Sequence, residues 1–346
     1  MTFKNCITDG VTEGAISQDQ ANEVLGLFDE LETQYNRQMG GAAASAKAAG
    51  DTTIAMKKMA IERKRRVALQ AQTWKGISND LANYRNGLGE NDKGAAALSL
   101  ISRDQRTKFN SVEDLQGIIE KSATRKMDKF LATFRRNLAG ETRNKAQLKN
   151  VIKEVFGEDT GDASAREMAG GWREASEYLR SRFNSAGGAI PKRTDWGLPQ
   201  MHNTLKIRQA SFAEWRDYTA SRLDLEKMTD EQTGLRFSPE KLEIALKDVY
   251  ETISTDGFSK IKPGAMAGGK SVANRRQDHR FLVFKNADSW LEYQQKFGES
   301  NPFDVMMGHL SVMSRDIGIM ERLGPNPTAT LNFIKQTIKK EAALTK

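Results

Sequence analysis

Residues 17–39 read SQDQANEVLGLFDELETQYNRQM and predict an amphipathic helix. Apolar side chains recur there at three- and four-residue spacings, which stack on one face of a helix. They are Val24, Leu25, Phe28, Leu31 and Tyr35. Ser17 stands before the pattern, where a serine hydroxyl can accept from a free backbone N–H of the first turn. We therefore expect a helix that begins after Ser17 and buries one stripe.

The following residues predict a second, longer helix that returns along the first. Gly40–Gly50 reads GGAAASAKAAG, and the glycines at both ends favour breaks, so we expect a flexible connection there. Asp51 is a suitable N-cap, and the helix is expected to end near Gly87 or Gly89. Its apolar positions are Ile54, Met59, Ile61, Val67, Leu69, Trp74, Ile77 and Leu81. The two segments together predict a long helical hairpin.

A basic cluster lies within the second of these helices, where residues 57–66 read KKMAIERKRR. Its cations are Lys57, Lys58, Arg63, Lys64, Arg65 and Arg66, and only Glu62 opposes them. One interpretation is a solvated helix face. The other is a surface for nucleic acid, an acidic partner or lipid headgroups.

Further amphipathic segments continue to the end of the chain and predict a mostly α-helical fold. Ser111 with Asp114, Ser211, and Ser238 before Pro239 are helix start signals. FLVF at 281–284 is the one run that suggests a strand, and a single strand builds no sheet. The acidic, glycine-bounded segment 157–161 predicts a division between an N-terminal part, residues 1–157, and a C-terminal helical domain, residues 158–346.

Composition bounds the functional classes that the chain can belong to. The chain has 346 residues, 53 Lys and Arg against 45 Asp and Glu, and a formal net charge of +8, which favours weak attraction to polyanions. Cys6 is the one cysteine, which excludes an internal disulfide and fits a reducing compartment. The first residues, MTFKNCITDG, lack the features of a signal peptide, and no apolar run approaches the roughly 18 to 20 residues of a membrane span.

No catalytic or cofactor motif stands out. The three histidines, His202, His279 and His309, have no zinc-ligand spacing, so we expect no metal site. AMAGGKS at 265–271, with Gly264 before it, has the GxxxxGKS spacing of a phosphate-binding loop. No hydrophobic strand precedes it, so we expect no nucleotide site there. Glu174 or Glu177, beside aromatic residues on one helix, is the best candidate for the general acid of a peptidoglycan hydrolase, but no second carboxylate motif supports it. We expect a protein without enzymatic activity or cofactor.

Residues 301–327, NPFDVMMGHLSVMSRDIGIMERLGPNP, predict a helix that starts at Asn301-Pro302 and ends at Gly324. Its methionines Met306, Met307, Met313 and Met320 lie on an apolar stripe. Methionine adapts to irregular neighbours, so this stripe is either core or a contact between subunits. His202, His279, Arg280 and His309 are expected to make polar contacts that fix the fold.

Three segments in the second half carry a family resemblance. They are RFN at 182–184 with Gly187-Gly188, DWGLPQMH at 195–202, and DHRFLVFKNADSWLEYQQKFG at 278–298 followed by residues 301–327. Together they resemble the large internal virion, or ejection, proteins of tailed bacteriophages over about residues 170–330. The resemblance implies a protein packed inside the capsid near the portal and expelled with the genome to help form a conduit across the host envelope.

Three functional hypotheses follow from these observations. The first is a phage structural protein that forms oligomers with itself, with the portal or with fellow ejection proteins, and that contacts DNA and the host membrane on ejection. The second is a nucleic-acid-binding accessory protein that uses the Lys57–Arg66 face. A hydrolase domain of a virion protein is the third and weakest alternative.

Overall fold

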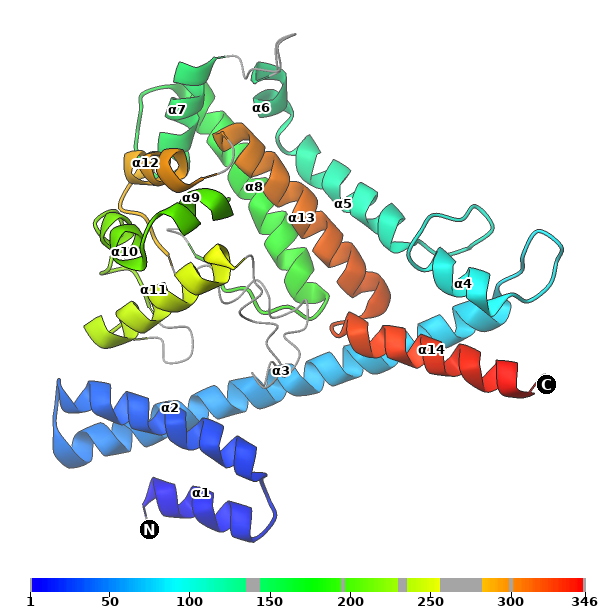
Figure 1. The fold of residues 1–346 in the computed structure, drawn as a ribbon, viewed down its shortest axis with the longest axis horizontal. Helices are drawn as coiled ribbons and strands as arrows, with labels where there is room; N and C mark the ends of the chain where they lie inside the picture. The colour runs from blue at the N-terminus through cyan, green and yellow to red at the C-terminus, as the bar shows by residue number, and fades with distance from the viewer. Residues whose placement is uncertain are drawn as a thin grey trace. The chain divides into compact units, whose positions relative to one another are not determined.

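The computed structural model describes residues 2–134, 144–193, 197–229, 235–255, 282–298 and 301–344. Within these ranges the chain forms fourteen α-helices, and its β pairing is limited to isolated bridges, so the prediction of a mostly α fold is confirmed (Figure 1). The helices are α1 (Phe3–Thr12), α2 (Gln18–Asn36), α3 (Gly41–Asn83), α4 (Lys93–Ser99), α5 (Val112–Arg125), α6 (Asp128–Thr133), α7 (Lys145–Val155), α8 (Ala163–Ser185), α9 (Thr204–Gln209), α10 (Phe212–Ala220), α11 (Pro239–Ser254), α12 (Ala287–Phe297), α13 (Pro302–Leu323) and α14 (Pro327–Leu344).

The predicted flexible connection at 40–50 is wrong. Residues from Gly41 onward are already helical, and α3 is one helix of 43 residues. Ala44 and Ala48 are fully buried against α2, because small side chains let two helices approach closely. Asp51 is therefore no N-cap; its carboxylate accepts a hydrogen bond from the Tyr35 hydroxyl at 2.5 Å instead. The chain reverses through Gly40, whose φ of 66° suits glycine.

Helix starts agree with the sequence more closely. Ser17 and Gln20 form a reciprocal capping box at α2, and Ser111 and Asp114 form another at α5. Asn301 caps α13 and accepts from the Asp304 backbone N–H. Each of these side chains satisfies a backbone donor that the first helical turn leaves free.

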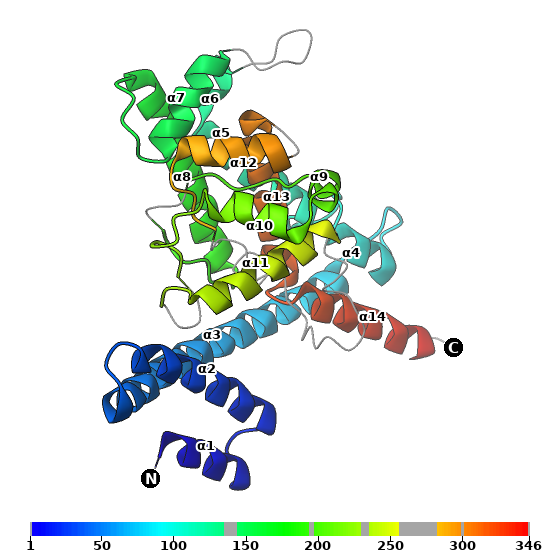
Figure 2. The ribbon, with the colours of Figure 1, turned by 60° about the vertical axis from the view of Figure 1, so that its left-hand side comes forward.

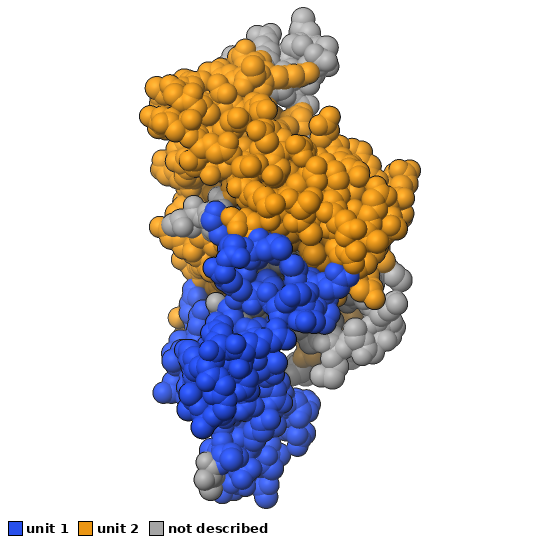
Figure 3. Space-filling view, turned by 90° about the vertical axis from the view of Figure 1, so that its left-hand side faces the viewer, with its two compact units in different colours: residues 1–65, 225–244 blue, residues 66–224, 245–346 orange. Residues whose placement is uncertain are grey.

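The chain divides into two compact units, coloured separately in Figure 3. Unit 1 comprises residues 1–65 and 225–244, and unit 2 comprises residues 66–224 and 245–346. This division differs from the expected one at residue 157, which lies inside unit 2. The physical reason is that α7 and α8, on either side of Gly157, pack against each other.

Unit 1 has its core between α1, α2 and the first part of α3. Leu27, Phe28 and Leu31 of α2 are buried there, and Phe3 of α1 stacks on Phe28 with ring centroids 4.8 Å apart. Lys241 at the start of α11 pairs with Glu30 of α2. This ion pair joins residues 225–244, the second chain segment of unit 1, to α2.

Unit 2 is built on α5, α8 and α13, which lie side by side in Figure 1. Two glycines permit their close approach. A Cβ on Gly171 of α8 would lie 2.5 Å from the Lys126 carbonyl oxygen, and one on Gly318 of α13 would lie 3.1 Å from the Val112 carbonyl oxygen. Larger residues at these positions would separate the helices.

An aromatic cluster joins α10 to α12, which are neighbours in Figure 2. The Trp215 indole N–H donates to the buried Tyr293 hydroxyl at 3.2 Å, and that oxygen lies 3.0 Å from His202 Nδ1. Burial raises the pKa of Tyr293, so its hydroxyl keeps its proton. Of the predicted FLVF strand, residues 282–284 are buried, but only an isolated bridge from Phe284 to Leu223 forms.

Candidate interaction surface on α3

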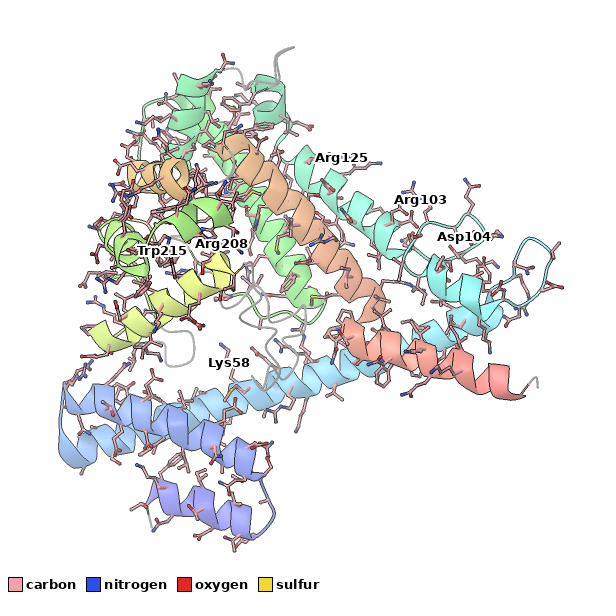
Figure 4. All side chains as sticks on the ribbon, in the orientation of Figure 1. Lys58, Arg103, Asp104, Arg125, Arg208 and Trp215 are labelled. Atoms are coloured by element: carbon pink, nitrogen blue, oxygen red, sulfur yellow. The ribbon has the colours of Figure 1, made fainter. Side chains whose placement is uncertain are left out.

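The basic cluster lies on the exposed side of α3, where Figure 4 labels Lys58. The side chains of Lys57, Lys58, Arg63 and Lys64 are exposed, and none of these four has an ion-pair or hydrogen-bond partner in the part of the chain that the structure describes. Arg65 is exposed as well. The exposure of Lys57, Lys58, Arg63 and Lys64 fits both interpretations that the sequence left open, a solvated helix face and a surface for a partner.

Arg66 differs from the rest of the cluster. Its side chain is only partly exposed, and its Nε donates to the Gly187 carbonyl oxygen at 2.9 Å. This bond joins α3 to the turn that follows α8. The sequence grouped Arg66 with the partner-binding cations, whereas the structure gives it a contact within unit 2.

Apolar residues are exposed between these cations, which sequence reasoning missed. Ile54, Ile61 and Val67 are 65%, 67% and 63% exposed. They were expected only as apolar positions of the helix. The missed signal is a seven-residue repeat, because each isoleucine is followed three and four residues later by a pair of basic side chains.

We call this repeat the α3 ridge and define it by six residues of unit 1. They are Ile54, Lys57, Lys58, Ile61, Lys64 and Arg65. Residues three, four and seven apart share one face of a helix, so the isoleucines lie in line and the cations flank them. The ridge presents apolar surface within positive charge, which suits an anionic partner that also carries apolar side chains.

No protein-family model matches the chain, and neither a curated protein nor a solved structure matches it.

The methionine stripe of α13 is mainly core. Met306, Met313 and Met320 are at most 1% exposed, and only Met307 is partly accessible. Three of the four methionines considered as subunit contacts are therefore covered within the chain itself. The helix that carries them packs against α5 and α8.

The two histidines that the structure describes lie against different aromatic residues. His202 lies against Tyr293 as described, and the His309 ring lies 5.8 Å from the ring of the buried Trp172. His279 and Arg280, which were expected to contact His309, lie outside the described residues. The described ranges hold no group of three His, Cys, Asp or Glu side chains that could bind a metal ion.

The two glutamates considered for catalysis are engaged by cations. Glu174 pairs with Lys126. Both Glu177 carboxylate oxygens accept from Arg180, at 2.7 and 2.8 Å, and this bonding lowers the pKa of Glu177. A general acid needs the opposite shift. The GKS sequence of residues 269–271 lies outside the described residues.

Over the residues that the structure places, no helix is both long enough and apolar enough for a transmembrane span.

Proposed function

We propose that this protein is a structural protein of the internal virion, or ejection, type, which acts by assembling with further copies and with other virion proteins during genome delivery. The resemblance over residues 170–330 motivates the proposal. The observation that supports it best is the α3 ridge, where two isoleucines about two-thirds exposed lie in line among exposed cations.

Exposed apolar side chains are ordinary when they are scattered singly. A row of them on one helix face is different, because aligned apolar side chains gain free energy when a partner covers them together. The flanking cations keep the free protein soluble and select the charge of the partner. A surface that combines exposed apolar and cationic side chains in this way suits the binding of a partner protein.

Size-exclusion chromatography with light scattering over a wide concentration range tests the proposal. We expect a discrete assembly whose population rises with concentration, and a ring or tube in electron micrographs of that peak, with and without lipid vesicles. A protein that remains monomeric at every concentration in both conditions would contradict the proposal.

The exposed cations favour a second candidate, a nucleic-acid-binding accessory protein. DNA affinity would then fall steeply with salt, with a slope of about 0.9 per phosphate contacted. Reversal of Lys57, Lys58 and Lys64 to glutamate should reduce both affinity and slope, whereas Lys121→Glu with Arg125→Glu, exposed on α5, is the control. Salt-insensitive binding, or none, would remove this candidate.

A further inference from the structure

A second exposed face of opposite charge lies on α11. Glu240, Asp248 and Glu251 are exposed there, and Ile244 between them is 68% exposed. Their spacings of four, seven and eight residues put them on one side of the helix. We call these four residues the α11 stripe. Lys247 lies at its edge, and Glu240 also has a long ion pair with Arg37 at 3.7 Å.

The α3 ridge and the α11 stripe match in both charge and spacing. Glu240 and Asp248 each lie four residues from Ile244, about 6 Å along a helix axis. The ridge has basic pairs three and four residues to either side of Ile61. When Ile61 is placed opposite Ile244, each acidic side chain reaches the level of a basic pair, whichever way the two helices run.

We propose that the α3 ridge of one copy docks the α11 stripe of a second copy. This inference rests on the proposed function and identifies the surfaces that carry the assembly. The contact covers Ile61 with Ile244 and pairs Lys57 and Lys64 with the carboxylates. Because the two faces differ, the interface is heterologous, and repeated use of it closes a ring or extends a filament.

Other occupants fit these observations less well. Two ridges facing each other would oppose cation to cation, which disfavours a symmetric contact through α3. Phosphates of a nucleic acid would neutralise the lysines but would leave the exposed isoleucines without an apolar cover. The α11 stripe supplies both the carboxylates and an exposed isoleucine.

Charge reversal in two separate variants tests this interface. Lys57→Glu with Lys64→Glu reverses the two lysines that the contact pairs, and Glu240→Lys with Asp248→Lys reverses the two carboxylates that lie opposite them. All four side chains are exposed, and the folding of each variant is checked by its thermal unfolding. We expect each variant alone to associate about tenfold or more weakly than the unaltered chain, because ion pairs are lost and like charges are opposed.

The two variants should associate again when they are mixed. In a mixture the new glutamates of the altered ridge meet the new lysines of the altered stripe, and the unaltered ridge meets the unaltered stripe, so the reversed pairs regain opposite charges. Simple damage to the fold would not be repaired by mixing. The control is Lys121→Glu with Arg125→Glu, which makes the same charge change on α5 and should leave association unchanged.

The outcomes separate the inference from the function that it rests on. Restored assembly in the mixture supports the interface. Oligomers that persist in both separate variants would overturn this interface and leave the proposed structural function standing. An unaltered chain that never associates would overturn both, and reversed ridge cations that abolish DNA binding without affecting association would assign the ridge to nucleic acid instead.

Discussion

Residues 54–67 of α3 and the middle of α13 carry similar apolar patterns but have opposite environments. Leu310, Met313 and Ile317 of α13 are at most 1% exposed, whereas Ile54 and Ile61 of α3 are about two-thirds exposed. The difference comes from the neighbours, since α5, α8 and α14 all contact α13. Helical periodicity predicts which residues share a face, but burial depends on whether another element covers that face.

The largest effect is expected where α13 is completely covered. Met313→Ala should lower the free energy of unfolding by about 2–5 kcal/mol, because the lost side chain leaves a cavity between packed helices. Urea denaturation measures this change. Met307→Ala on the same helix is the matched control, and its cost should be smaller because Met307 is partly exposed. Equal costs at the two positions would contradict the assignment of Met313 to the core.

Two adjacent glycines of α8 sharpen the comparison between covered and open helix faces. Gly171→Ala should cost about 1–3 kcal/mol, because its Cβ would press on the Lys126 carbonyl oxygen. Gly170→Ala should stabilise by about 0.5–1 kcal/mol, since no atom lies within 4 Å of a Cβ there and alanine favours helix. Thermal unfolding of both variants tests this, and a shift of the same sign in both would contradict the close approach of α5 to α8.

Charged groups show the same contrast, because Lys57, Lys58 and Lys64 of the ridge are exposed while Glu154 of α7 is buried and hydrogen-bonded. The Thr160 backbone N–H and hydroxyl both donate to this carboxylate at 2.8 Å, which lowers its pKa below the ordinary 4.5. Its contribution to stability is therefore complete above pH 4.5 and is lost as the pH falls through the folded-state pKa.

Glu154→Gln should lower stability on the order of 1 kcal/mol at neutral pH and make the acid side of the stability curve shallower. Chemical denaturation between pH 3 and pH 7 measures both effects. Glu13→Gln, at an exposed position of unit 1, is the control and should leave the curve unchanged. An unchanged slope in the Glu154 variant would mean that its hydrogen bonds are absent in solution.

Local chemistry let the sequence predict where several helices start. Ser17, Ser111 and Asn301 each cap a helix as expected, because a cap depends on one side chain and the next three residues. The mostly α fold class followed from apolar spacing. These features need no knowledge of distant parts of the chain.

Features that depend on distant neighbours were predicted poorly. Residues 40–50 contain glycine at both ends, yet their alanines pack on α2 and keep the segment helical. Arg66 was grouped with its neighbours on the strength of charge, although its partner, the Gly187 carbonyl, is 121 residues away in sequence. The sequence did not decide whether the methionines of α13 belong to the core or to a contact between subunits, because the helices that pack on α13 are distant in sequence.

The smallest effect on stability is expected at Ile61, and it separates the two regions most clearly. Ile61→Ser removes an apolar side chain that is 67% exposed, so the unfolding free energy of dilute protein should change by no more than about 0.5 kcal/mol. Removal of a similar apolar side chain from the buried face of α13 would lower the free energy of unfolding much more. If the ridge docks a second copy, the same substitution should nevertheless weaken concentration-dependent association, because Ile61 loses the cover of Ile244. A variant that unfolds more easily even at low concentration would show that Ile61 is covered within its own chain, and the ridge would then be part of a core.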